Sequence, residues 1–235
     1  MGQSEKARRN IGVLTVILLG ITGCSVAGGG GAGESGPGLK LQPESSASAI
    51  PSGGLDHLSL ASGDAAGYSI GVLDDAAQVH PSDVVADEVC RALAYVLAGA
   101  APGSPASTTV RRALGKESET TVALASYTDS RAVGILTDLS TAADACPGGF
   151  DLTVRGQKRH VTKVSRALAP PGTDQAMAFN MTVETGGTKE PAQVIVVRKD
   201  STIGIFSSSP VGAAKPPANF AVPAPVVEAQ LIKLG

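Results

Sequence analysis

The sequence predicts an α+β domain in which an antiparallel β-sheet packs against helices on one face. Two segments, 81–99 and 129–146, repeat apolar residues at the spacing of a helix. After Gly149 the period changes to two, and short strand-like segments follow one another with tight turns between them, which favours antiparallel pairing. The helical segments carry Cys90 and Cys146, so the fold class includes two long helices linked by a disulfide.

The first half of the domain contains strands and helices in alternation. A glycine-rich turn precedes a predicted strand at 68–73, and Pro81 then opens the helix that ends at Gly99. We expect a short helix at 107–114 and a β-rich strand at 120–127. The second long helix follows from Asp129 and ends at the Pro-Gly-Gly sequence after Cys146.

The second half reads as a run of strands closed by a helix. Gly186-Gly187 and Lys199-Asp200 mark the last turns as hairpins. An amphipathic helix is expected at 223–234. The strands are predicted at 150–154, 161–168, 176–183, 193–197 and 203–206.

Residues 1–23 have the layout of a lipoprotein signal peptide. Basic residues at Lys6, Arg8 and Arg9 precede an uncharged run from Ile11 to Ile21, which is too short to span a bilayer comfortably. The sequence Ile21-Thr22-Gly23-Cys24 resembles the bacterial lipobox, and that resemblance implies cleavage before Cys24 and diacylglycerol on its thiol. Two acyl chains suffice for stable anchoring, whereas one holds only marginally. An ordinary secretory signal with a chance cysteine is the alternative, and the export route, general secretory or twin-arginine, stays open.

Between the leader and the domain, residues 24–54 are predicted to form a flexible tether. This segment is rich in Gly, Ser and Pro and has little to bury. Its central part, 26–52, has roughly 27 residues, which at about 5–6 Å × √n give an r.m.s. reach of about 30 Å. The remainder, 55–235, has the length of a single globular domain.

Composition excludes some classes of function. The net charge is −2, and the chain has no Trp, three Tyr and four Phe, so it offers neither a basic patch nor an aromatic platform for nucleic acid. Beside Cys24, only Cys90 and Cys146 remain, and a pair of cysteines in an exported domain is typical of a disulfide. Two free buried thiols are the alternative; a metal site is disfavoured because no Cys-x-x-Cys occurs and the histidines are scattered.

Two short segments match sequence motifs of enzymes. Gly31 to Gly36 matches the dinucleotide-binding pattern G-x-G-x-x-G, but it lies in the tether, without the strand and helix that such a loop requires. Gly67-Tyr68-Ser69-Ile70-Gly71 matches the G-x-S-x-G pattern of serine hydrolases, with His80 or His160 as a conceivable base. A helix should follow that serine directly, whereas strand residues follow Ser69.

The whole layout resembles actinobacterial (streptomycete-type) lipoproteins of unknown function. The residues that carry this resemblance are the lipobox, Gly63-Asp64 and Gly67-Tyr68, the two helix-borne cysteines, and the closing segment 222–234. More distantly, two cysteine-bearing helices followed by antiparallel strands are similar to PknH-like extracellular sensor domains of mycobacteria, which implies ligand sensing or cell-envelope binding without catalysis. The chain departs from that group by having one cysteine pair besides Cys24 and no Trp, so no ligand-binding residues are carried over.

These observations predict a non-catalytic domain that is tethered to the extracytoplasmic face of the cell membrane through diacylglyceryl Cys24. Its partner would be an unknown envelope protein or a small ligand, with no cofactor, no metal and no nucleic acid. A surface serine hydrolase using Ser69 is the alternative function.

Overall fold

The computed structural model describes residues 52–212 and 219–235. The predicted leader 1–23, Cys24 and the glycine string at 31–36 lie outside the described residues. Within the described ranges, no helix is both long and apolar enough to cross a bilayer. Helix α1, Ser52–Leu58, places the start of regular structure slightly before the predicted domain boundary at residue 55.

The described residues form a nine-stranded antiparallel sheet with the strand order β1-β3-β4-β9-β8-β7-β6-β5-β2. The remaining α-helices are α2 (Arg91–Leu97), α3 (Asp129–Ala145) and α4 (Ala224–Leu234), and a 3₁₀ turn, η1, spans Pro81–Asp83. The strands are β1 (Ser69–Val72), β2 (Val84–Ala86), β3 (Ser107–Leu114), β4 (Ser118–Ser126), β5 (Phe150–Val154), β6 (Gln157–Ala167), β7 (Gln175–Thr185), β8 (Thr188–Lys199) and β9 (Thr202–Pro210).

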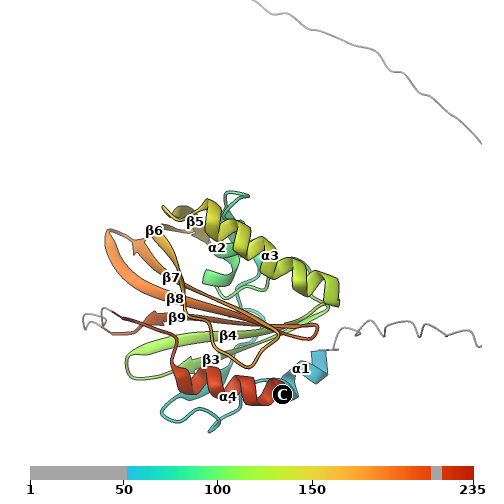
Figure 1. Ribbon diagram of the computed structural model, residues 1–235. Helices are drawn as coiled ribbons and strands as arrows, with labels where there is room; N and C mark the ends of the chain where they lie inside the picture. The colour runs from blue at the N-terminus through green and yellow to red at the C-terminus, as the bar shows by residue number, and fades with distance from the viewer. Residues whose placement is uncertain (1–51, 213–218) are drawn as a thin grey trace, which may run out of the picture. The chain divides into compact units, whose positions relative to one another are not determined.

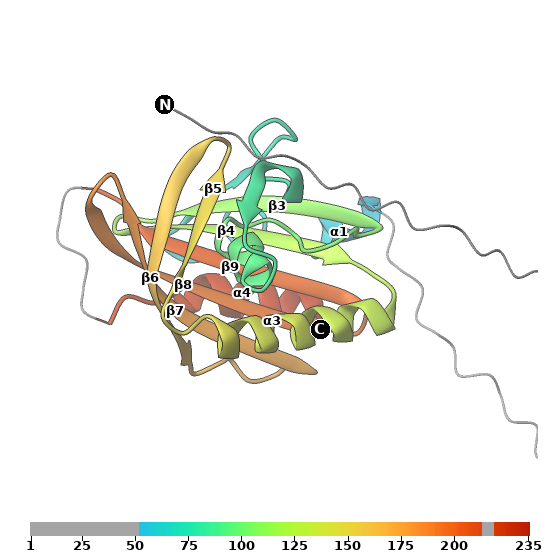
Figure 2. The ribbon, with the colours of Figure 1, turned by 90° about the horizontal axis from the view of Figure 1, so that it is seen from above.

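The predicted α+β class with an antiparallel sheet is confirmed, but the helices, expected on one face, divide between the two faces of the sheet because each face carries its own apolar cluster (Figure 1). Helices α2 and α3 share one face, as predicted for the two cysteine-bearing helices, whereas α1 and α4 lie on the other. Figure 2 shows the same arrangement, with α3 in front of the strands and α4 behind them. In β8, Val194 and Val196 pack towards α2 and α3, while Ile195 and Val197 pack towards α4. A strand buried on both faces reads as a continuous apolar run.

The segment 107–114, predicted as a short helix, is instead strand β3. It pairs along its whole length with β4, from Ser107 opposite Ser126 to Leu114 opposite Glu119. The β-branched run Thr108-Thr109-Val110 favours this conformation, because such side chains fit a pleated surface better than a helix.

The long helix predicted over 81–99 is also wrong in its first half. Only α2 is an α-helix there, and β2 precedes it as an edge strand paired with β5. Val85 and Val89, which helical spacing assigned to the buried stripe, are 68% and 61% exposed, whereas Leu93 and Val96 are buried as expected. The β-branched pair Val84-Val85 again prefers a strand.

Cys90 and Cys146 form the predicted disulfide. Their Cα atoms lie 6.1 Å apart, which allows a bridge without backbone movement. Cys90 is the N-cap of α2 and Cys146 the C-cap of α3, so the bond ties the start of one helix to the end of the other. Both cysteines are buried in the core beneath these helices.

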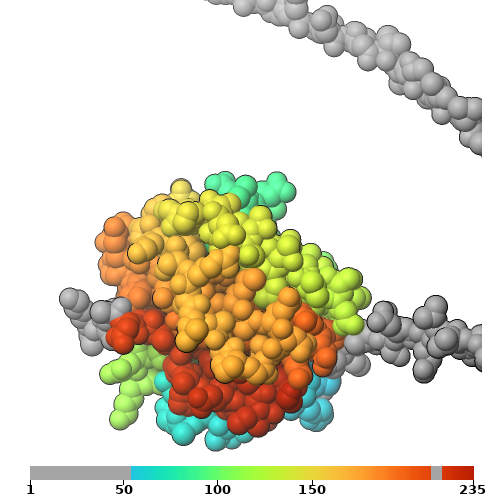
Figure 3. All heavy atoms as spheres, in the orientation of Figure 1, coloured from blue at the N-terminus to red at the C-terminus, as the bar shows by residue number. Residues whose placement is uncertain are grey.

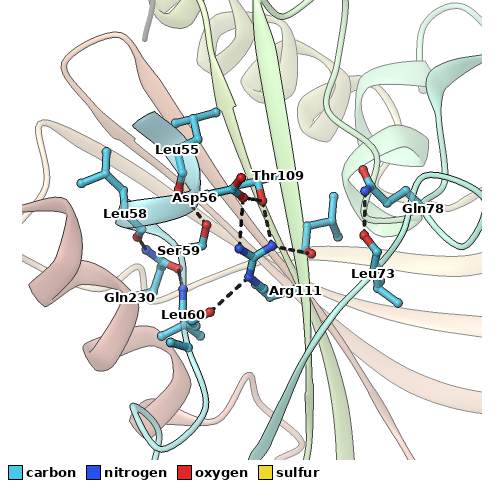
Figure 4. A network of polar contacts seen from close by, with 12 residues as sticks. Leu55, Asp56, Leu58, Ser59, Leu60, Leu73, Gln78, Thr109, Arg111 and Gln230 are labelled. Carbon is cyan, nitrogen blue, oxygen red and sulfur yellow. Dashed lines mark hydrogen bonds and ion pairs between the residues drawn. The ribbon is translucent and has the colours of Figure 1, made fainter. Parts of the chain in front are cut away.

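On the opposite face, a buried arginine holds α1 against the sheet (Figure 4). Arg111 of β3 donates hydrogen bonds to the Asp56 carboxylate at 3.1 Å and to the backbone oxygen of Leu60 at 3.2 Å. Hydrogen bonds from Thr109 and then from Arg111 lower the pKa of Asp56. Gln230 of α4 is fully buried and donates to the backbone oxygen of Leu58, so α1, β3 and α4 are joined by polar contacts.

Candidate functional site

The sheet splits at one end, between β8 and β9. These strands pair from Lys199 opposite Thr202 to Gln193 opposite Ser208, and their ladder then stops. If the same register continued, Pro191 would stand opposite Pro210. Figure 1 shows the ends of β7 and β8 turning away from those of β9 and β4.

The hydrogen-bond pattern explains why the ladder stops at this position. The backbone N–H of Val211 donates to the backbone oxygen of Glu117, just before β4. Every second residue of β9 therefore forms its backbone hydrogen bonds with β4, and the residues between them, including Pro210, face β8. By the same alternation Pro191 faces β9. Proline has no N–H, so two donors are missing from facing edges of the split. On their other sides, β8 continues to pair with β7, and β9 with β4.

A cleft of about 450 Å³ lies at this split, and we refer to it as the split cleft. One wall comes from the β7–β8 hairpin and the other from β4 and β9, while the end of α2 closes the deep end. The lining residues are Val79, Leu97, Ala98, Glu119, Thr121, Val154, Arg159, Val183, Thr185, Glu190, Pro191, Ala192, Ser207, Ser208 and Ser209.

The polarity of the sheet face changes where the cleft begins. Along β9, Ile203 and Ile205 are buried in the core under α2 and α3, and the next residues on that face are Ser207 and Ser209. Along β4, buried Ala125 and Ala123 are likewise followed by Thr121 and Glu119. Because side chains on one face recur every second residue, each strand switches from apolar to polar at the edge of the helical cover.

The deep end of the cleft is fixed by contacts to the end of α2. The Ser207 hydroxyl donates to the backbone oxygen of Leu97 at 2.6 Å. Gly99 follows with φ +74°, and a Cβ atom there would lie 2.8 Å from the Thr121 methyl carbon. Glycine therefore allows the chain to turn close above the floor of the cleft.

Three charged side chains line the split cleft: Glu119, Glu190 and Arg159. Within the described part of the chain, none of the three forms an ion pair. Together with the hydroxyls of Thr121 and Ser209, they offer hydrogen-bond acceptors and one guanidinium donor to a polar molecule. No aromatic side chain lines this cleft, so stacking against a sugar or base is not available within it.

Ser69 does not lie in a nucleophile elbow. It is exposed on the edge strand β1, opposite Leu114 of β3, and the strand continues to Val72 instead of turning into a helix. Its conceivable bases are engaged elsewhere, since His80 lies 3.4 Å from the carboxylate of Asp75 and His160 lies 2.7 Å from that of Asp151. The structure therefore does not bring the residues of the predicted hydrolase together.

Among the described residues, no group of three or more His, Cys, Asp or Glu side chains is placed to hold a metal ion. Cys24, the predicted lipidation site, lies outside the described residues.

Sequence reasoning missed the split cleft, although its cause is visible in the sequence. The strands predicted at 193–197 and 203–206 end short of Pro191 and Pro210, and proline is rarely found within a central strand. Strand β8 in fact extends past Pro191 to Thr188 and β9 reaches Pro210, and at these prolines each strand pairs on its outer side alone. A pair of prolines at equal distances from a hairpin turn is the signal that could have indicated the split.

No protein-family model matches the chain, and no curated protein sequence matches it. Among solved structures, the extracellular domain of PknH from Mycobacterium tuberculosis has a TM-score of 0.52 at 12% identity, covering 80% of this chain and 95% of that one. An uncharacterized protein from Mycobacterium smegmatis has a TM-score of 0.36 at 12% identity, covering 71% of this chain and 83% of that one. At the level of the fold, the expected resemblance to PknH-like extracellular domains is confirmed, and the resemblance to streptomycete-type lipoproteins stays a prediction. The described chain thus shares the fold of the PknH extracellular domain.

Proposed function

We propose that this chain is an extracytoplasmic lipoprotein whose domain binds a small polar ligand in the split cleft, without catalysis. The observation that carries the proposal is the change from apolar to polar residues on one sheet face, at the point where Pro191 and Pro210 separate the strands. Unpaired strand edges and charged side chains would cost stability in a purely structural sheet, so their concentration in one hollow favours a binding role.

The proposed location rests on three independent features. The leader and Cys24 have the pattern of a lipoprotein signal. The disulfide between Cys90 and Cys146 suits an oxidising compartment. The fold is similar to that of a domain described as extracellular.

A ligand screen by thermal unfolding tests the binding role. The full-length chain would be heated with separate amino acids, sugars, nucleotides and short peptides as probes. A ligand present at 100 times its Kd stabilises the folded state by about 2.7 kcal/mol. At this chain length, that corresponds to a rise in Tm of roughly 5–11 °C.

Variants then locate the binding. Ser209→Trp places a large side chain in the mouth of the split cleft, whereas Ser62→Trp changes an exposed serine elsewhere and is the matched control. We expect the ligand-dependent rise in Tm to be lost in Ser209→Trp and kept in Ser62→Trp. A rise that survives in both variants would place the ligand outside the cleft and contradict the proposal.

The anchor is tested separately in a bacterial host, by labelling with a clickable fatty acid. We expect the label to be lost and the protein to leave the membrane fraction in Cys24→Ser, while Cys90→Ala with Cys146→Ala retains the label. Undiminished labelling of Cys24→Ser would exclude Cys24 as the lipidated residue.

The rival function is a serine hydrolase that uses Ser69. Covalent labelling with a fluorophosphonate probe distinguishes it from the non-catalytic proposal. Without a base or an elbow beside Ser69, we expect no stoichiometric labelling of the folded protein. Labelling that disappears in Ser69→Ala would refute the non-catalytic proposal.

A further inference from the structure

A second hollow lies on the face of the sheet opposite the split cleft, and we refer to it as the α4 groove. Its volume is about 640 Å³. Helix α4 forms one wall with Val227 and Leu231, and the connection after β6 forms the other with Leu168 and Pro170. Figure 3 shows the light orange residues of this connection beside the red residues of α4.

Hydrogen bonds at the floor hold the groove in shape. The Gln193 side chain donates to Asn180 at 2.7 Å, and its oxygen accepts a hydrogen bond from the backbone N–H of Val222 at 2.8 Å. These bonds attach the segment before α4 to β8 and β7. The amide of Gln193 is therefore engaged within the protein, and the groove is prepared before any ligand enters.

The walls of the groove are mostly apolar. Leu168 is 96% exposed, although it borders a hollow that also contains Phe220 and the buried Ile195. A single exposed leucine needs no explanation, but an exposed leucine on the rim of an apolar groove is typical of a binding site. The body of a ligand that fits these walls must itself be apolar, because the walls offer few hydrogen-bonding groups.

One charged residue, Glu228, lies among the residues that line the α4 groove. It is exposed on α4, and no other described residue forms a hydrogen bond or an ion pair with its carboxylate. A carboxylate in contact with solvent attracts a cation and repels an anion. The groove thus combines a long apolar surface with a single negative charge.

We propose that the α4 groove binds a single-chain amphiphile, with its alkyl chain between α4 and the connection after β6 and a cationic head beside Glu228. Charge complementarity selects this occupant over a fatty acid, whose carboxylate would be repelled. The site is separate from the split cleft, because the two lie on opposite faces of the sheet, and the proposal stands without the polar ligand proposed above.

Binding of three dodecyl amphiphiles to the full-length chain tests this site. The probes are dodecyltrimethylammonium, dodecyl maltoside and dodecanoate, titrated calorimetrically below their micelle concentrations. We expect one saturable site, with the cation bound roughly two- to fivefold more tightly than dodecanoate, the range expected of an exposed charge pair. Glu228→Gln should remove this preference while retaining binding of the maltoside.

Two exposed apolar residues provide a matched pair that leaves the fold unchanged. Leu168 lines the groove, whereas Ile232, 81% exposed on the same helix as Glu228, does not. Leu168→Ser should weaken all three amphiphiles severalfold, and Ile232→Ser should not. Filling the groove with Ala224→Trp should abolish binding. Residues 1–51 are identical in every variant, so any amphiphile that they bind does not affect the differences between variants.

Three outcomes would overturn the proposal. These are tighter binding of dodecanoate than of the cation, equal effects of the two serine variants, and unchanged binding by Ala224→Trp. Self-association of the free chain that is broken by Ala224→Trp and competes with the amphiphiles would show that the groove seats a second copy instead, and would also count against it.

Discussion

Reduction of the disulfide between Cys90 and Cys146 should lower the stability of the domain by about 4 kcal/mol. The two residues are 56 positions apart, and the chain-entropy model gives about 4 kcal/mol for a closed loop of roughly that length. One kcal/mol shifts Tm by about 2–4 °C in domains of this size. The expected fall in Tm is therefore about 8–16 °C.

Differential scanning calorimetry with and without reductant measures this change, and intact mass confirms that two hydrogens are gained. The variant with both Cys90→Ala and Cys146→Ala is the matched control, because its Tm should not respond to reductant. Its Tm should lie slightly below that of the reduced protein, since both side chains are buried and their truncation leaves small cavities.

The reasoning is refuted if the mass shows full reduction and Tm changes by less than about 2 °C, which is below the range given by the entropy of the loop. An unchanged mass on treatment with reductant under denaturing conditions would show instead that the bond is absent.

Three further predictions follow from the geometry. Gly149→Ala should lower the free energy of unfolding by about 3 kcal/mol or more, because φ is +101° and the new Cβ would lie 1.8 Å from a backbone oxygen. Gly148→Ala has open space around it and should lower that free energy by under about 0.5 kcal/mol, so equal Tm values of the two variants would contradict this. The lowered pKa of Asp56 contributes stability that is present above about pH 4 and lost as the pH falls through that lowered pKa. In Asp56→Asn, the free energy of unfolding measured by chemical denaturation should therefore decline less as the pH falls. Parallel pH profiles of the two proteins would count against this. The double variant Pro191→Thr with Pro210→Thr should restore two N–H donors and extend the β8–β9 ladder. Hydrogen exchange should then show both new amides protected, and their rapid exchange would exclude this account.

Local pattern in the sequence was sufficient for much of the fold. The strands from Phe150 onward alternate at period two, and α3 carries its apolar residues at helical spacing, so each of these elements was predicted, although β6, β8 and β9 are longer than the predicted segments. The cysteine pair was predicted from counting alone. These features depend on neighbours within one element or on composition, which a single sequence contains.

The errors fell where residues distant in sequence decide the outcome. Segment 107–114 is a strand because β1 and β4 flank it on both sides, and Val84-Val85 form an edge strand because β5 lies beside them. The β-branched residues of both segments are compatible with a strand, and these pairing partners decide that a strand forms.

By itself, the sequence determined the α+β class, most strands and the disulfide pair, because hydrophobic period and cysteine number are properties of the chain. Only the tertiary structure decided that helices cover both faces and that β8 and β9 separate before Pro191 and Pro210. The split cleft depends on that separation, and on Glu119, Arg159 and Glu190 reaching one hollow from three strands. The hairpin turn after Lys199 sets the register of β8 against β9, whereas packing across the whole sheet sets the positions of β4 and β6 beside them, and no local pattern contains that packing.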